Sequence, residues 1–277
     1  MTQSRPRPAD SETYTHGYHK AVVAQHASRT ASEAAAFVLP RLRAGMNLLD
    51  IGCGPGSITL GLADAVAPGH VTGIDIGDEP IRQARVAASN KGITNVSFEV
   101  GSVYDLAFPD ATFDSVYMHQ VLQHLARPAD ALRQASRVLR QGGLIAVREV
   151  DWGSTVIWPR MPLLDRFLQL YHDVAARNGG DADAGRSVRR WLNGAQFENI
   201  ELSASHWVFP GRDTTANYGE SWAERTAQSN IAVKAIEYKL SDQSELDRIA
   251  AAWREWGTDP DAFFAFTHVE GIAIRRS

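Results

Sequence analysis

The stretch NLLDIGCGPGSIT, residues 47–59, decides the fold of this chain. An apolar run leads into three glycines, Gly52, Gly54 and Gly56, and a helical pattern begins directly after them. Glycine accepts positive φ and lets the backbone approach a ligand, because no Cβ intervenes. The spacing is G-x-G-x-G and differs from the G-x-G-x-x-G of dinucleotide-binding folds. We therefore predict a ligand-binding turn between a first strand and a first helix.

Short apolar runs bounded by glycine or aspartate continue beyond this turn and alternate with helical stretches. The further strand candidates are HVTGIDI (70–76), VSFEVG (96–101), FDSVYMH (113–119) and GLIAVREV (143–150). The helical stretches are SITLGLADAV (57–66), EPIRQARVAASNKG (79–92) and PADALRQASRVLRQGG (128–143). Strands that are apolar on both faces and alternate with helices require a parallel sheet covered on both sides. The sequence predicts a doubly wound α/β core at about residues 45–150.

The remaining segments frame this core. Residues 14–39 have helical spacing and predict an N-terminal helical cap over residues 1–40. Behind the core of residues 41–152, residues 153–277 supply a sixth and a seventh strand, NIELSASHWVFP (199–210) and AFFAFTHVEGIAIRR (262–276). A helix-rich segment at 211–258 separates them and is expected over the carboxyl edge of the sheet, as a substrate lid. The prediction is one domain with a seven-stranded, Rossmann-like sheet.

Composition excludes several classes of protein. Of 277 residues, 44% are hydrophobic and 22% charged, which is typical of a globular chain. The 32 acidic and 28 basic side chains give a formal charge of −4, so we expect no nucleic-acid partner. Cys53 is the only cysteine, which excludes an intrachain disulfide and a thiolate-rich metal site and fits the cytoplasm. No apolar run approaches the ~18 to 20 residues of a spanning helix, so we expect no membrane partner. The histidines lack the spacing of metal ligands, so we expect no bound metal.

Polar residues follow the ends of the predicted strands. Asp75 ends the second strand, where an acidic side chain of a doubly wound fold accepts hydrogen bonds from a ribose diol. Ser102 follows the third strand. His119 and Gln120 follow the fourth on the same carboxyl edge. His119 is a candidate general base near neutral pH, with a hydrogen-bonded pocket wall as the alternative interpretation.

Taken together, these motifs resemble those of a known family. LLDIGCGPGSIT, GIDI, VGSVYDLAFPDATFDSVYMHQVLQHL and RVLRQGGLIAVRE are similar to the successive motifs of class I S-adenosylmethionine-dependent methyltransferases. The similarity is to the branch that includes ubiquinone and menaquinone C-methyltransferases, and it covers about residues 45–152. The N-terminal segment also resembles a cap of fungal and actinobacterial members. The resemblance implies S-adenosylmethionine as the cofactor and S-adenosylhomocysteine as the product.

The resemblance also implies cofactor contacts, residue by residue. The expected cofactor-binding set is Arg29, Asp50, Gly52, Gly54, Asp75, Ile76, Ser102, Val103, His119 and Gln120. Gly52 and Gly54 would pass the methionine portion, Asp75 would hold the ribose hydroxyls and Ile76 would pack on adenine. These assignments place the cofactor across the ends of the first three strands.

Three of these positions carry further expectations. Ser102 and Val103 would flank the adenine edge, although the family usually has Asp where this chain has Ser102. A hydroxyl there replaces an acceptor carboxylate. Arg29 would pair with the methionine carboxylate of the cofactor, since a guanidinium matches a carboxylate fork; the alternative is a solvated helix face.

The function implied is methyl transfer to a small-molecule acceptor by in-line displacement. A sulfonium donor already carries the positive charge, so the protein mainly aligns the reactants and excludes water. His119 is the predicted catalytic residue. Aromatic side chains of 152–172 and 207–256 outnumber candidate charged contacts, which favours an apolar or aromatic metabolite. The alternative is a catalytically silent regulatory module that binds S-adenosylmethionine or a nucleotide.

Overall fold

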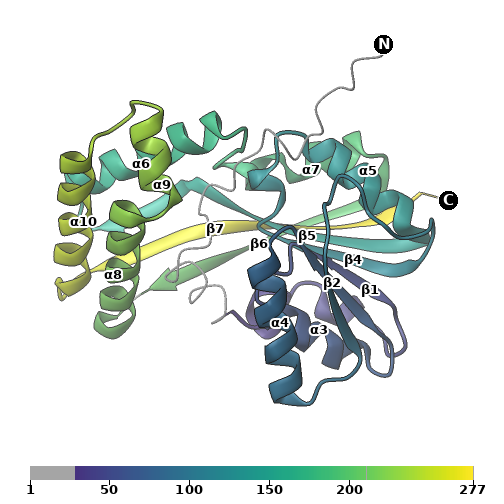
Figure 1. Cartoon of the computed structure of the whole chain (residues 1–277). Coiled ribbons are helices and arrows are strands. Elements are labelled where there is room, and N and C mark those ends of the chain that lie inside the picture. The colour runs from purple at the N-terminus through teal and green to yellow at the C-terminus, as the bar shows by residue number, and fades with distance from the viewer. Residues whose placement is uncertain (1–28, 210, 277) are drawn as a thin grey trace, which may run out of the picture.

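Within residues 29–209 and 211–276, which the computed structural model describes, seven strands form one mixed sheet in the order β3-β2-β1-β4-β5-β7-β6 (Figure 1). The strands are β1 (Leu48–Ile51), β2 (Val71–Asp75), β3 (Val96–Val100), β4 (Phe113–His119), β5 (Leu139–Trp158), β6 (Phe197–Phe209) and β7 (Phe263–Arg275). The first five are parallel, and β7 runs antiparallel to both β5 and β6. The predicted seven-stranded, doubly wound sheet is confirmed.

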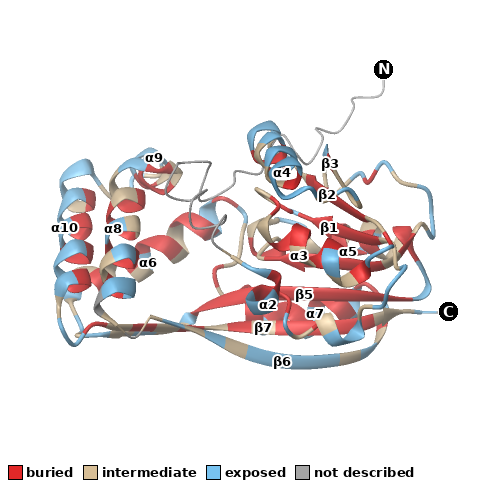
Figure 2. Ribbon diagram, turned by 90° about the horizontal axis from the view of Figure 1, so that it is seen from below, coloured by how far each residue is buried: buried red, intermediate tan, exposed pale blue. Residues whose placement is uncertain are grey.

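Helices cover both faces of this sheet, because strand side chains alternate between two apolar cores. Leu48 packs with the helices of one face and Leu49 with those of the other. The first face carries α2 (Ala31–Ala34), α3 (Ser57–Val66) and α4 (Asp78–Lys91); the second carries α5 (Pro128–Val138) and α7 (Val188–Gly194). Short 3-10 helices lie at η2 (Leu39–Arg41), η3 (Leu122–His124) and η4 (Ala184–Ser187). Figure 2 shows the central strands as mostly buried between these layers.

β5 extends well beyond its predicted end at residue 150. It pairs with β7 along two stretches that are separated by a register shift between Asp151 and Val156. Ser154 closes this bulge: its hydroxyl donates to the Asp151 carbonyl at 2.6 Å and accepts from the Thr267 amide at 2.9 Å. Gly153 and Ser154 are typical of a turn, which is why the sequence placed the end of the strand too early.

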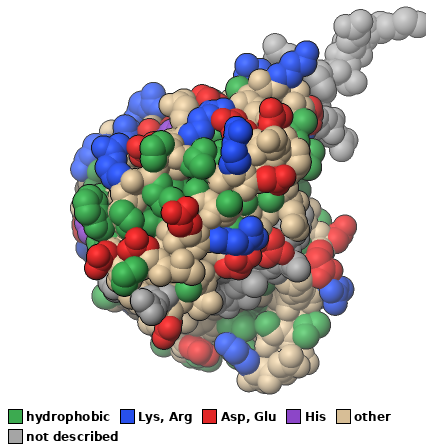
Figure 3. All heavy atoms as spheres, turned by 90° about the vertical axis from the view of Figure 1, so that its left-hand side faces the viewer, with side chains coloured by type: hydrophobic (Ala, Val, Ile, Leu, Met, Phe, Trp, Pro, Cys, Tyr) green, Lys and Arg blue, Asp and Glu red, His purple; other side chains and the backbone are tan. Residues whose placement is uncertain are grey.

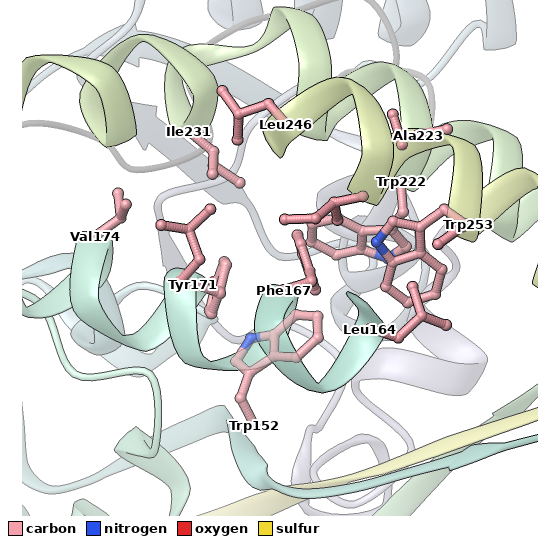
Figure 4. Close-up of a cluster of buried hydrophobic side chains, with 14 of the residues drawn as sticks. Trp152, Leu164, Phe167, Tyr171, Val174, Trp222, Ala223, Ile231, Leu246 and Trp253 are labelled. Atoms are coloured by element: carbon pink, nitrogen blue, oxygen red, sulfur yellow. The ribbon is translucent and has the colours of Figure 1, made fainter. Parts of the chain in front are cut away.

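A helical bundle packs on the far ends of β5 and β7 (Figure 1). Its members are α6 (Pro162–Arg177), α8 (Arg212–Gln228), α9 (Asn230–Glu237) and α10 (Gln243–Thr258). The segment 211–258 is therefore helical, as predicted. Trp222, Trp253 and Trp256 are fully buried, and the Trp222 and Trp253 rings stack at 6.1 Å. Figure 4 shows Phe167 and Tyr171 of α6 pointing toward Trp222 and Trp253, so these rings form the core of the bundle.

Only the last part of the expected N-terminal cap can be compared with the structure, since residues 1–28 lie outside the described residues. The helix expected to continue to residue 39 ends at Ala34. The Tyr117 hydroxyl donates to the Ala34 carbonyl at 2.8 Å and so takes an acceptor that a longer helix would use. Arg29 precedes α2, and is thus not on a helix.

Candidate active site

In the glycine turn after β1, one glycine packs against a neighbouring loop and another is open to a ligand. Gly52 and Gly54 have φ of +74° and +53°, which favours glycine at both positions. A Cβ on Gly52 would lie 2.5 Å from Cγ2 of Val121, so Gly52 allows the loop after β4 to pack against the turn. A Cβ on Gly54 would meet no atom of the described residues within 4 Å. Within that part of the chain, Gly54 therefore presents bare backbone to open space at the carboxyl end of β1.

Asp75 lies beside this turn at the end of β2. Its Oδ2 accepts a hydrogen bond from the Gly54 amide at 3.0 Å, and its Oδ1 accepts one from the Gly77 amide at 2.9 Å. Each carboxylate oxygen is thus held by a backbone amide, which fixes the carboxylate beside the glycine turn. The neighbouring Ile76 is 60% exposed, which offers an apolar surface next to that polar group.

Three other expected contacts lie at the end of β1 and directly after β3. Asp50 is 2% exposed and accepts a hydrogen bond from Thr59 of α3 at 2.6 Å. Desolvation raises the pKa of Asp50 to about 7; the Thr59 hydrogen bond opposes this shift and the Asp75 charge adds to it. Ser102 is half-buried and its hydroxyl accepts from the Tyr104 amide at 3.2 Å, while Val103 is buried. Asp50 thus ties the turn to α3, and Ser102 shapes the loop after β3.

His119 ends β4 and Gln120 follows it, next to a group of aromatic rings. The buried His119 ring lies parallel to that of Tyr117, with centroids 6.4 Å apart and 4° between the planes. It is also 6.1 Å from the Trp207 ring and 6.2 Å from the His268 ring. Gln120 has φ of +55°, and its Nε2 lies 2.7 Å from Nε2 of His268. The structure therefore joins both expected residues to β6 and β7.

A buried ion pair that the sequence interpretation missed lies on the same face. His119 of β4 is in register with Arg148 of β5, and Arg148 with Glu270 of β7. Arg148 Nε donates to Glu270 Oε1 at 3.2 Å and Nη2 donates to the Ser205 hydroxyl at 3.0 Å. The guanidinium lies 5.1 Å from the Trp207 ring centroid. The available signal was the charged pair of Arg148 and Glu149 inside an otherwise apolar strand, since charged side chains are almost never fully buried unless paired.

The side chain of Glu149 lies on the opposite face of the sheet from that of Arg148 and holds the loop after β4. Its carboxylate accepts from the amides of Val121 and Leu122 at 3.0 and 2.8 Å and from Gln123 at 3.3 Å. Burial raises the pKa of Glu149 to about 8, against the lowering effect of these hydrogen bonds. The carboxyl group thus fixes the loop that packs against Gly52.

Arg29 reaches the same region from the N-terminal side. Its guanidinium lies 5.1 Å from the Trp207 ring centroid, on a ring that Arg148 also contacts. In residues 29–209 and 211–276, no group of three or more His, Cys, Asp or Glu side chains could hold a metal ion. Nor does a helix in those ranges have the length and apolar character needed to cross a membrane.

A family model described as a methyltransferase domain matches residues 42–195. This chain belongs to the methyltransferase family. The methyltransferase is 35% identical over 270 residues to an uncharacterized methyltransferase of Schizosaccharomyces pombe, and the match covers 94% of this chain and 96% of that protein. It is 37% identical over 139 residues to the 27-O-demethylrifamycin SV methyltransferase of Amycolatopsis mediterranei, covering 49% of this chain and 50% of that one.

A solved structure agrees with this assignment at the level of the fold. The methyltransferase is similar to phosphoethanolamine N-methyltransferase 2 of Haemonchus contortus, solved with phosphomonomethylethanolamine and S-adenosylhomocysteine. The TM-score is 0.55 at 16% identity, over 87% of this chain and 52% of that one. The class I fold is thereby confirmed, and membership of the methyltransferase family supports S-adenosylmethionine as the cofactor. The residues at the strand ends fit that cofactor, because Gly54 leaves an open cradle beside the Asp75 carboxylate and the exposed Ile76.

Proposed function

We propose that this methyltransferase transfers the methyl group of S-adenosylmethionine to a small-molecule acceptor that binds over β4 and β5. The order of the strands carries the proposal. The adenine is expected beside Ile76 and Ser102, the ribose hydroxyls on Asp75 of β2, and the methionine portion over Gly54 after β1. Neighbouring strands are about 4.8 Å apart. The next strand, β4, then brings His119 close to the reacting methyl group.

The chain's own residues align the reactants and exclude water. Methyl transfer is an in-line displacement, so its rate depends on holding the acceptor atom behind the methyl group. The rings of Tyr117, His119 and Trp207 form a largely buried wall on which a flat acceptor packs. His119 accepts the proton when the acceptor is a hydroxyl. Arg29 is proposed to pair with the methionine carboxylate, because a guanidinium matches a carboxylate fork.

Three observations favour a small apolar or aromatic acceptor. The half-buried Trp207 and the buried Phe266, 5.7 Å apart, add aromatic surface next to His119. The relative from Amycolatopsis mediterranei is named for a rifamycin, which is a small molecule. Finally, the end of the molecule that carries α8 and α10 displays acidic and basic side chains together (Figure 3), where nucleic-acid binding would call for a basic surface.

A labelling experiment tests the proposed function. The purified protein is incubated with S-adenosylmethionine that carries a labelled methyl group and with extracts of small metabolites. We expect one small molecule to gain the label, with one equivalent of S-adenosylhomocysteine formed. If no molecule of any extract gains the label while the protein still binds S-adenosylhomocysteine, the protein is a silent binding module instead.

The role of His119 is tested with the acceptor found in that way. If a proton must leave the acceptor, His119→Ala is expected to lower kcat ~10²-fold or more and to change the pH profile of kcat. His70→Ala is the matched control, because His70 precedes β2 at the opposite edge of the sheet, where it contacts Ser97. A full rate with an unchanged pH profile in His119→Ala would exclude His119 as the base.

A further inference from the structure

Two buried hydrogen-bond donors near His119 have no partner among the described residues. Arg148 is 1% exposed; its Nε and Nη2 bind Glu270 and Ser205, and its Nη1 binds no described residue. His268 is 0% exposed, and its Nε2 faces the Gln120 amide nitrogen at 2.7 Å. The amide donates there, so the proton of the neutral ring lies on Nδ1, which likewise lacks a partner in the described part of the chain. Buried donors are normally satisfied, so both point to a missing acceptor.

The two donors lie on one face of the sheet and on one aromatic ring. Arg148 is in register with Glu270, and His268 precedes Glu270 by two residues, so its side chain projects from the same face as a diagonal neighbour. The Trp207 ring is 5.1 Å from the Arg148 guanidinium and 4.5 Å from the His268 ring. His119 adjoins both, by register with Arg148 and at 6.2 Å from the His268 ring.

The charge in this region favours an anion. The Glu270 carboxylate is already engaged, since it accepts from Ser203 at 2.7 Å, from Ser205 at 2.6 Å and from Arg148. Arg29 brings further positive charge, since its guanidinium lies 5.1 Å from the centroid of the same Trp207 ring. Burial, followed by the charges of Arg148 and Arg29, holds the pKa of His268 well below its usual range, so His268 stays a neutral donor.

We propose that Arg148 and His268 form an anion site for the acceptor, which therefore carries a carboxylate or another oxyanion that is already ionised at pH 7. This inference rests on the proposed function. The oxygen accepts from Nη1 of Arg148 and Nδ1 of His268, and the acceptor then extends over His119 toward the cofactor. Hydrogen bonds between ionised groups are stronger than neutral ones, and a dry site strengthens them further.

The position in the sheet separates this site from the cofactor. β5 and β7 lie two and three strands from β1, which corresponds to about 10 and 14 Å. The glycine turn that receives the methionine portion follows β1. We therefore assign a carboxylate at Arg148 and His268 to the acceptor. The methionine carboxylate is the rival source, since Arg29, its proposed partner, contacts the same Trp207 ring as Arg148; the variants below distinguish the two.

Fractionation of the metabolite extract tests the charge of the acceptor. The extract is passed over an anion exchanger at pH 7, and each fraction is incubated with the protein and methyl-labelled S-adenosylmethionine. We expect labelling only with retained, anionic fractions. Labelling with the unretained fraction would overturn the inference while leaving the proposed function intact. Labelling with no fraction would contradict the proposed function itself.

Variants test the two donors, with the active fraction as the probe. His268→Phe removes Nδ1 and keeps a ring, and is expected to raise the KM of the acceptor at least tenfold with the affinity for S-adenosylhomocysteine unchanged. Arg148→Lys keeps a charge for Glu270 and is expected to act in the same direction. His206→Phe, on the exposed side of β6, is the control and should change neither value. Loss of S-adenosylhomocysteine affinity in His268→Phe would assign the donors to the cofactor, and an unchanged KM would overturn the site.

Discussion

Replacing Asp75 by alanine tests the position of the ribose. The carboxylate holds the Gly54 and Gly77 amides at 3.0 and 2.9 Å and, in our proposal, one or two ribose hydroxyls as well. A hydrogen bond to a charged group contributes about 1.5 to 3 kcal/mol, and each 1.4 kcal/mol corresponds to about tenfold in affinity. Loss of one ribose contact therefore weakens cofactor binding about tenfold or more, and release of the Gly54 loop adds to that loss.

Titration calorimetry with S-adenosylhomocysteine measures this effect without knowledge of the acceptor. Asp75→Asn keeps one carbonyl oxygen and should fall between the wild type and Asp75→Ala. Asp78→Asn is the control, because Asp78 is exposed in the first turn of α4 and lies outside the expected contact set. Circular dichroism establishes that each variant is folded. A dissociation constant of folded Asp75→Ala within twofold of the wild-type value would refute the placement of the ribose at β2.

Three further predictions concern single substitutions. Gly54→Ala and Gly142→Ala both place alanine at positive φ with open space around Cβ, which costs about 1 to 2 kcal/mol of strain each. Thermal unfolding should show the same loss of stability in both variants. Calorimetry should show loss of S-adenosylhomocysteine affinity only for Gly54→Ala. The pKa of Glu149 is about 8 in the folded state against 4.5 in the unfolded state, so the folded state binds the extra proton between these values. Urea unfolding should therefore show a free energy of unfolding that falls as the pH rises from about 4.5 to 8. The fall should be shallower in Glu149→Gln. Trp253→Ala should cost about 3 to 5 kcal/mol of unfolding free energy, whereas Trp158→Ala, at a 57% exposed side chain, should cost less than about 1 kcal/mol.

The core of the fold could be predicted because its signals are local. The glycine turn at 52–56 and the apolar runs of β1 to β4 specify strand, turn and helix from neighbouring residues alone. The long β5 escaped prediction because Gly153 and Ser154, which form a bulge, are typical of a turn. The helix expected to residue 39 stops at Ala34 because of a hydroxyl from Tyr117, 83 positions away in the chain.

In the candidate site, too, some residues could be predicted from the local sequence and others could not. Asp75 and Gly54 follow the ends of adjacent parallel strands, so their sequence positions were enough to bring them together. Arg148, His268 and Glu270 meet only because β7 inserts antiparallel between β5 and β6, and no local pattern encodes that pairing. Asp50 differs from these residues: it was expected to contact the cofactor, and its carboxylate accepts a hydrogen bond from Thr59 beneath the turn.

Hydrogen–deuterium exchange with and without S-adenosylhomocysteine tests the central claim most directly, because it reports on every strand end at once. We predict slower exchange at three separate segments, 52–56, 75–77 and 102–104, which follow β1, β2 and β3. The irregular start of β5 around Gly142, at the opposite edge of the sheet, should exchange at the same rate in both states. Saturating ligand that leaves these three segments unchanged and protects another part of the chain would contradict the placement of the cofactor across the carboxyl ends of β1 to β3.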